Sequence, residues 1–319
     1  MATGLIQALL LDGAGRGRTL ATWDEVVAWH PNDGVLWLNL DYSIDDVASW
    51  LRDRSQIDPL VLAALVDPDP RPRAVAHGED LLMIVRAINL NQGAEPEDMI
   101  SVRCFIEPRR IVTLRHRVSR SLDALVAEVA AGSGPIGAGD FTARFVERTL
   151  DLVVTRVDVL GDEIAGCEDE VLDRQHGADM RGRLADHRRR AIQLRRFLAP
   201  QREALGKLAT ISLPWLDAMQ RARMVEAADR MTRTVEELDA ARDRAAVTQE
   251  ELASRVGEVT NQRLYFLSLV TAIFLPLGFM CSLLALPMQH DSWQFWTLIA
   301  AFGAGVIAQR WWFKKRGWL

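Results

Sequence analysis

"LYFLSLVTAIFLPLGFMCSLLAL" occupies residues 264–286, a run of 23 residues without a charged side chain. A helix of about 20 predominantly apolar residues crosses the ~30 Å core of a bilayer. The alternative is a buried helix of a soluble protein, but soluble helices of this length usually keep a polar face. Pro276 fits a membrane helix, because neighbouring helices can satisfy the carbonyl that a proline leaves free. The stretch therefore predicts a membrane span.

A second apolar stretch, "WQFWTLIAAFGAGVIAQRWWF", follows at residues 293–313, with tryptophans at both ends as in an aromatic belt. Only residues 287–292 separate the two stretches, and they contain no lysine or arginine. The tail, "KKRGWL" at 314–319, is basic, so the positive-inside rule places it in the cytoplasm. Two spans then place the large N-terminal region in the cytoplasm and the short connection outside.

The N-terminal region alternates short apolar stretches with short helical ones. "GVLWLNLD" (34–41) and "LLMIVRAINL" (81–90) are typical of strands. "MISVRCFIE" (99–107) and "RIVTLRHR" (110–117) flank a Pro-Arg corner and predict an antiparallel hairpin. Asp58, followed by a proline, is a helix N-cap candidate. These features predict a mixed α/β sheet domain.

Long helices follow. We expect Asp140 to cap a helix that extends to about residue 175, a second helix over about 178–209, and a third that starts near Pro214 and meets no further proline until Pro276. Apolar residues recur along the third helix at spacings of three, four and seven, which is typical of a stalk packed against partner helices. Since a lone stalk cannot bury that stripe, the pattern predicts an oligomer. The stripe comprises Ala228, Met231, Val235, Leu238, Ala245, Leu252, Val256 and Val259.

Charge and composition exclude several classes of function. The net charge of −5 gives no basic field for nucleic acid. The spacing of the three cysteines fits neither a zinc knuckle nor a disulfide framework. The sequence also contains no nucleophile–base motif of the kind that would indicate an enzyme. "DGAGRGR" (12–18) fits a strand-connecting turn better than a phosphate loop. The basic residues at 187–190 and 195–196 form either a solvated helix face or a site for anionic lipids or acidic partner helices.

The whole pattern resembles the CorA-type divalent-cation transporters, and within them the ZntB zinc-transporter branch. The resemblance lies in residues 81–117, in "ISLPWLDAMQ" (211–220), in "NQRLYFLSLVTAIFLPLGF" (261–279) and in the ending "KKRGWL". It implies a homopentamer in the inner membrane, in contact with membrane lipids, that transports divalent cations, zinc above all. Proton coupling is proposed for the zinc branch. No resident cofactor is implied, since the cation is the transported substrate.

The expected fold is a cytoplasmic α/β domain, a mixed sheet with helices, followed by long stalk helices and two C-terminal transmembrane helices in a CorA-like arrangement. The expected segments are a cytoplasmic α/β domain at 1–139, a cytoplasmic helical hairpin at 140–210, a stalk helix at 211–263, transmembrane helix 1 at 264–286, an outer loop at 287–292, transmembrane helix 2 at 293–313 and a basic cytoplasmic tail at 314–319.

The resemblance also implies which face of the first span lines the pore. The family's pore positions map onto residues at spacings of three and four, consistent with one helix face. Plain helix packing would produce the same stripe, so both interpretations remain open here. If the stripe lines a pore, its large apolar side chains would gate by constriction and dewetting. The positions are Asn261, Leu264, Leu267, Thr271, Leu275 and Gly278.

The outer mouth departs from the family pattern. The family ends its first span with Gly-any-Asn, and the aligned positions here are Ala285, Leu286 and Pro287. The nearest ionisable side chains are His290 and Asp291, which are either metal ligands or a polar turn. The lost motif leaves a second hypothesis open: a membrane-anchored relative with altered selectivity, or one that no longer conducts and has a structural or regulatory role.

Overall fold

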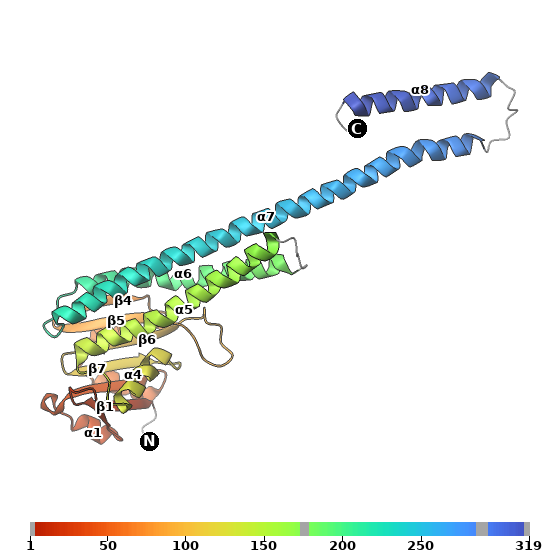
Figure 1. Cartoon of the computed structure of the whole chain (residues 1–319). Helices are drawn as coiled ribbons and strands as arrows, with labels where there is room; N and C mark the ends of the chain where they lie inside the picture. The colour runs from red at the N-terminus through yellow and green to blue at the C-terminus, as the bar shows by residue number, and fades with distance from the viewer. Residues whose placement is uncertain (1–3, 173–178, 285–292, 316–319) are drawn as a thin grey trace. The chain divides into compact units, whose positions relative to one another are not determined.

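The computed structural model describes residues 4–172, 179–284 and 293–315 (Figure 1). The chain divides into two compact units, Met1–Glu250 and Glu251–Leu319. The first unit contains all the strands of the described chain and most of its helices, and the second contains the C-terminal part of one long helix and the final helix.

A seven-stranded mixed sheet forms the centre of the first unit, in the order β2-β1-β3-β7-β6-β5-β4. Neighbouring strands pair antiparallel except β3 and β7, which are parallel. The predicted hairpin is confirmed as β6 and β7. The strands are β1 (Leu5–Leu11), β2 (Gly17–Thr19), β3 (Val35–Asp41), β4 (Arg73–His77), β5 (Asp80–Ala87), β6 (Ile100–Ile106) and β7 (Arg110–Arg115).

Short helices cover one face of this sheet. Because successive side chains of a strand point to opposite faces, Leu36, Leu38 and Leu40 of β3 share one core with Val47 and Leu51. The helices of this layer are α1 (Trp23–Val27), α2 (Asp45–Asp53) and α3 (Pro59–Leu65), and a short 3-10 turn spans Pro31–Asp33. As predicted, a side-chain cap starts α3, since Asp58 Oδ1 accepts the N–H of Leu60 at 2.8 Å.

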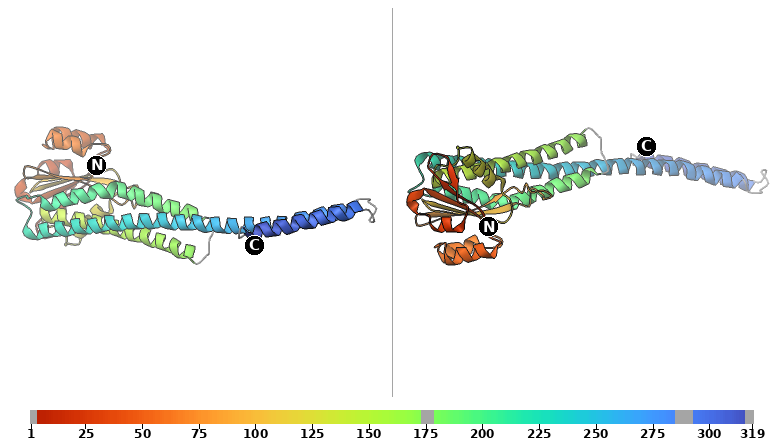
Figure 2. Two further views of the ribbon diagram at one scale, coloured as in Figure 1. Left: turned by 90° about the horizontal axis from the view of Figure 1, so that it is seen from above. Right: turned by 90° about the horizontal axis from the view of Figure 1, so that it is seen from below.

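Longer helices cover the opposite face (Figure 2). Trp37 of β3 packs against Phe141 there, with ring centroids 4.9 Å apart. The helices of this layer are α4 (Arg120–Ala130), α5 (Ala138–Leu172), α6 (Met180–Thr210) and the N-terminal part of α7 (Ala218–Leu284). Together with the sheet, the two helical layers confirm the predicted α/β fold.

Two expected helix starts were wrong. The amide of Phe141 already bonds to the Gly137 carbonyl, so α5 begins before Asp140, whose Oδ2 accepts the N–H of Ile136. The third long helix begins at Ala218 and not near Pro214. A side-chain acceptor determines this start, because Asp217 Oδ1 accepts the N–H of Gln220 at 2.7 Å.

The stalk stripe is buried largely within one chain, which corrects the argument made from its periodicity. Met231, Val235, Leu238 and Ala245 are at most 1% exposed and pack with α5 and α6 in the core. Val256, farther along, is 41% exposed. The stripe up to Ala245 therefore gives no support for an oligomer.

The second unit is apolar on its outside. Leu267, Phe274 and Leu275 on α7 are each more than 60% exposed, as is Ile307 on α8 (Trp293–Lys315). Of the helices in the described residues, α7 is the one long and apolar enough to cross a membrane. Its apolar segment is not buried inside the chain. Such surface is unfavourable in water and favourable in lipid. The predicted segment boundaries and the second span remain predictions.

Candidate functional site

The predicted pore positions lie on one helix, α7, and form an uncovered stripe. All six are exposed, and their spacing repeats at about one helical turn, so they share a face. We call this set the α7 stripe: Asn261, Leu264, Leu267, Thr271, Leu275 and Gly278.

Helix α8 contacts a different side of α7. The rings of Phe279 and Phe302 stack with centroids 5.4 Å apart. Phe279, Pro276 and Ala272 each follow a stripe residue by one position, which is about 100° around the helix. Pro276 and Ala272 are half-buried, whereas the stripe residues before them are exposed. Packing against α8 therefore does not account for the stripe, and its role as a pore lining stays a prediction.

The stripe offers few polar groups to a cation. Thr271 Oγ1 donates to the Leu267 carbonyl at 2.9 Å, so only its lone pairs are free to face outward. Asn261 precedes the apolar run, and the remaining stripe residues have no side-chain ligand atom. An apolar constriction of this kind can gate by dewetting but cannot replace the hydration shell of an ion.

No metal centre accompanies the stripe within the described parts of the chain, where no group of three or more His, Cys, Asp or Glu side chains could hold a metal ion. The predicted outer mouth, Ala285, Leu286 and Pro287, lies outside the described residues, and so do His290 and Asp291. Their predicted role is therefore untested.

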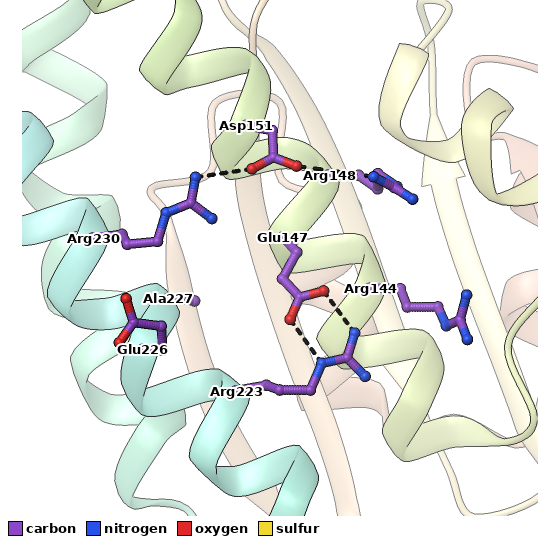
Figure 3. Close-up of a pocket in the computed structure, with 8 residues that line it drawn as sticks. All are labelled: Arg144, Glu147, Arg148, Asp151, Arg223, Glu226, Ala227 and Arg230. Atoms are coloured by element: carbon purple, nitrogen blue, oxygen red, sulfur yellow. Dashed lines mark hydrogen bonds and ion pairs between the residues drawn. The ribbon is translucent and has the colours of Figure 1, made fainter.

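A charged pocket of about 260 Å³ lies between α5 and α7 in the first unit (Figure 3). Arg223 reaches from α7 to Glu147 on α5 with two hydrogen bonds of 2.7 and 2.6 Å, and to Asp140 at 2.9 Å. The hydrogen bonds that Arg223 donates to Glu147 raise its pKa most, and the bond that it donates to Asp140 adds to this effect against the opposing effect of burial. One turn farther along α5, Asp151 accepts a hydrogen bond from Arg230 at 2.9 Å.

These pairs hold the start of α7 against α5, and they occupy the charges that a ligand would need. We call them the α5–α7 clamp: Asp140, Glu147 and Asp151 with Arg223 and Arg230. No pattern in the sequence had predicted it. The sequence does contain two relevant patterns: the acids Glu147 and Asp151 on α5 are four residues apart, and the two arginines on α7 are seven residues apart. These spacings place each pair on one side of its helix, but they do not reveal that the two helices are neighbours.

Two further motifs take simple structural roles. In residues 12–18, Asp12 Oδ1 accepts the N–H groups of Ala14 and Arg16 at 2.8 and 3.0 Å, so the segment is the turn between β1 and β2. Of the basic α6 residues, Arg190 lies 3.8 Å from Glu163, and Arg195 pairs with Asp239. Acidic side chains of α5 and α7 in the same chain thus already pair with some of these basic residues.

The arrangement matches a known family along nearly its whole length. A family model described as "CorA-like Mg2+ transporter protein" matches residues 32–315. The chain belongs to the CorA-like family. Because the matched range includes strands β3 to β7, the long helices and the apolar part of α7, the predicted family resemblance is confirmed. The CorA-like family is one of transporters, in agreement with the prediction that the chain is not an enzyme.

Relatives within this family match the full length. The chain is 32% identical to the zinc transport protein ZntB of Yersinia enterocolitica, covering 97% of this chain and 94% of ZntB. It is 33% identical to the divalent cation transporter CmaX of Pseudomonas aeruginosa, covering 99% and 97%. The structure of full-length CmaX superposes with a TM-score of 0.88 at 32% identity, covering 98% of this chain and 97% of CmaX.

A more distant CorA-like structure supports the fold alone. The CorA magnesium transporter from Methanocaldococcus jannaschii has a TM-score of 0.75 at 17% identity, with both chains covered completely.

Proposed function

We propose that this protein transports divalent metal cations, with zinc as the main substrate, across the inner membrane through a homopentameric pore coupled to protons. The observation that carries the proposal is the full-length match to ZntB at 32% identity and to CmaX at 33% identity. The match includes the apolar part of α7 as well as the cytoplasmic sheet. This chain therefore has both the membrane region and the cytoplasmic region that these relatives have.

The uncovered α7 stripe supports a pore made by several copies. One helix cannot enclose an aqueous path, and α8 contacts another side of α7. Leu267 and Leu275, which are 61% and 73% exposed in the single chain, would then face their counterparts around an axis. These apolar side chains would be equally stable in contact with lipid, so a functional test is needed to show that they line a pore.

The proposed topology has both termini in the cytoplasm and residues 287–292 outside. A reporter that is active only in the cytoplasm, fused after Leu319, is expected to give signal, because the basic residues 314–316 resist translocation. A periplasmic reporter at the same site serves as the matched control and should stay silent. The reverse pattern in a well-expressed fusion would contradict the two-span arrangement.

A second candidate function is a relative that no longer conducts, and the sequence of the mouth favours it. An asparagine offers a carbonyl and an amide to the water around an ion. Pro287, at the aligned position, offers no side-chain polar atom and no backbone donor. A conducting protein must therefore recruit cations with other groups, and we propose His290 and Asp291.

Purified protein in liposomes distinguishes the two candidates. We expect zinc uptake along an imposed gradient, with weak discrimination among divalent ions, because an exposed site retains a high dielectric. Replacing His290 and Asp291 together by alanine should lower uptake at low zinc concentration more than at high. Uptake should also fall as the pH drops through about 6.5, the pKa of a free histidine, since a protonated imidazole has no lone pair to offer a metal ion.

The outcomes separate clearly. If the wild-type protein transports no divalent cation under any ion or proton gradient, the transporter proposal fails and the non-conducting relative remains. If uptake is normal and the double alanine variant behaves like the wild type, the transporter proposal is supported, but His290 and Asp291 do not recruit the ion.

A further inference from the structure

Helices α5 and α6 carry opposite charge. Helix α5 has nine acidic and three basic side chains, a net charge of −6, whereas α6 has nine basic and two acidic ones, a net charge of +7. The whole chain has a net charge of only −5, so the charge is concentrated locally. Part of it is neutralised within the chain, for example where Arg183 on α6 pairs with Glu170 on α5 at 2.7 Å.

Three acids on α5 are left without such a partner. Asp158, Asp162 and Asp169 are exposed, and within the described chain none of them forms an ion pair. Their spacings of four and seven residues place them on one side of the helix. Val159, beside them, is 43% exposed. We call these four residues the acidic α5 face.

A matching set lies on α6. Arg181 and Arg188 are exposed and also make no ion pair among the described residues, and Ile192 and Arg196 continue the same side at four-residue spacings. Ile192 is 51% exposed, and the guanidinium of Arg196 lies 5.5 Å from the centre of the Phe197 ring. We call Arg181, Arg188, Ile192 and Arg196 the basic α6 face.

The two faces match in spacing and chemistry. Seven residues separate Asp162 from Asp169 and Arg181 from Arg188, which is about 10.5 Å along each helix at 1.5 Å per residue. Each face also includes one exposed branched apolar side chain, Val159 or Ile192. An apolar contact flanked by opposite charges is therefore available when one face meets the other.

The two faces do not pair within one chain. Helices α5 and α6 contact each other through other side chains, such as Glu163 and Arg190, and no ion pair among the described residues joins the two faces. We infer that the acidic α5 face of one copy binds the basic α6 face of the next. Such a contact is head-to-tail, and a repeated head-to-tail contact closes into a ring when its rotation allows. The inference rests on the proposed oligomer and assigns the surfaces that join its cytoplasmic units.

The chemistry favours a second copy over an anionic membrane surface. Lipid headgroups would satisfy the basic α6 face but would leave the acidic α5 face unpartnered. A neighbouring copy satisfies both at once. Because exposed ion pairs are individually weak and screened by salt, the contact is expected to direct assembly in combination with other surfaces.

Cross-linking between differently tagged copies tests the inference. Full-length chains with Asp162→Cys and one tag are co-expressed with chains with Arg188→Cys and a second tag, and membranes are treated with a short bis-maleimide. We expect a product that contains both tags, in at least tenfold excess over that from a control pair in which Arg54→Cys replaces Arg188→Cys. Arg54 is exposed and directly follows α2, which covers the opposite face of the sheet.

Charge exchange gives a second readout. Asp158→Arg with Asp169→Arg in the first copy should lower the two-tag product several-fold, and adding Arg181→Glu with Arg196→Glu in the second copy should restore it. The control Asp53→Arg, at an exposed residue of α2, should leave the yield of the two-tag product unchanged.

Three results would overturn the inference. One is an oligomer in native mass spectrometry without the two-tag product, which leaves the proposed function intact. Another is a monomer only, which removes the proposed pore as well. The last concerns the double variant Arg181→Glu, Arg188→Glu. If this variant forms the same oligomer as the wild type but binds phosphatidylglycerol vesicles less well, the basic α6 face binds lipid.

Discussion

Leu238→Asp is expected to unfold the first unit, Met1–Glu250, rather than to dissociate subunits. Leu238 is fully buried against α5 and α6 within its own chain. The change removes a buried leucine side chain and introduces a charge without a partner, a combination that costs about 3–5 kcal/mol or more. That is a large part of the stability of an ordinary domain, about 5–15 kcal/mol. We expect the thermal unfolding transition of the purified protein in detergent, followed by circular dichroism, to move far down or disappear.

Val247→Asp is the matched control, because it places the same charge on the same helix where the side chain is 64% exposed. Its effect on stability should stay within about 0.5 kcal/mol. If Leu238→Asp kept the wild-type transition and instead produced monomers in native mass spectrometry, the stripe would be an interface between copies, as its periodicity alone had predicted.

Gly278→Trp is expected to abolish zinc uptake in liposomes while leaving the fold intact. A Cβ atom at Gly278 would meet no atom within 4 Å in the single chain, so the position is open where a larger side chain begins. In a ring of copies around the α7 stripe, however, several indoles would converge on the same axis and close it. We expect at least a tenfold loss of uptake with an unchanged unfolding transition and an unchanged oligomer.

Gly305→Trp on α8 provides the control, since a Cβ atom at Gly305 would likewise meet nothing within 4 Å. Uptake near the wild-type level is expected for this variant. Equal uptake by the Gly278→Trp and Gly305→Trp proteins would show that the α7 stripe faces lipid and not a pore. The transporter proposal would then need another path for the ion.

The sequence by itself determined the elements and their character. The uncharged run at 264–286 indicated a membrane helix, and α7 is the helix that meets this description in the structure. Apolar stretches bounded by turn residues indicated the sheet, and Asp58 was correctly recognised as the cap of α3. These features are local: each depends on residues a few positions apart, which a periodic pattern or a cap motif records directly.

Only the tertiary structure decided which surfaces meet. The periodicity of α7 showed that a face around Leu238 is buried but not by which chain, and α5 and α6 of the same chain bury it. The α5–α7 clamp joins Arg223 to Glu147, residues 76 positions apart, and β3 pairs in parallel with β7 across a similar distance along the chain. Hydrophobic periodicity reports that a side chain leaves water, whereas its partner depends on how distant elements pack, and no local pattern records that.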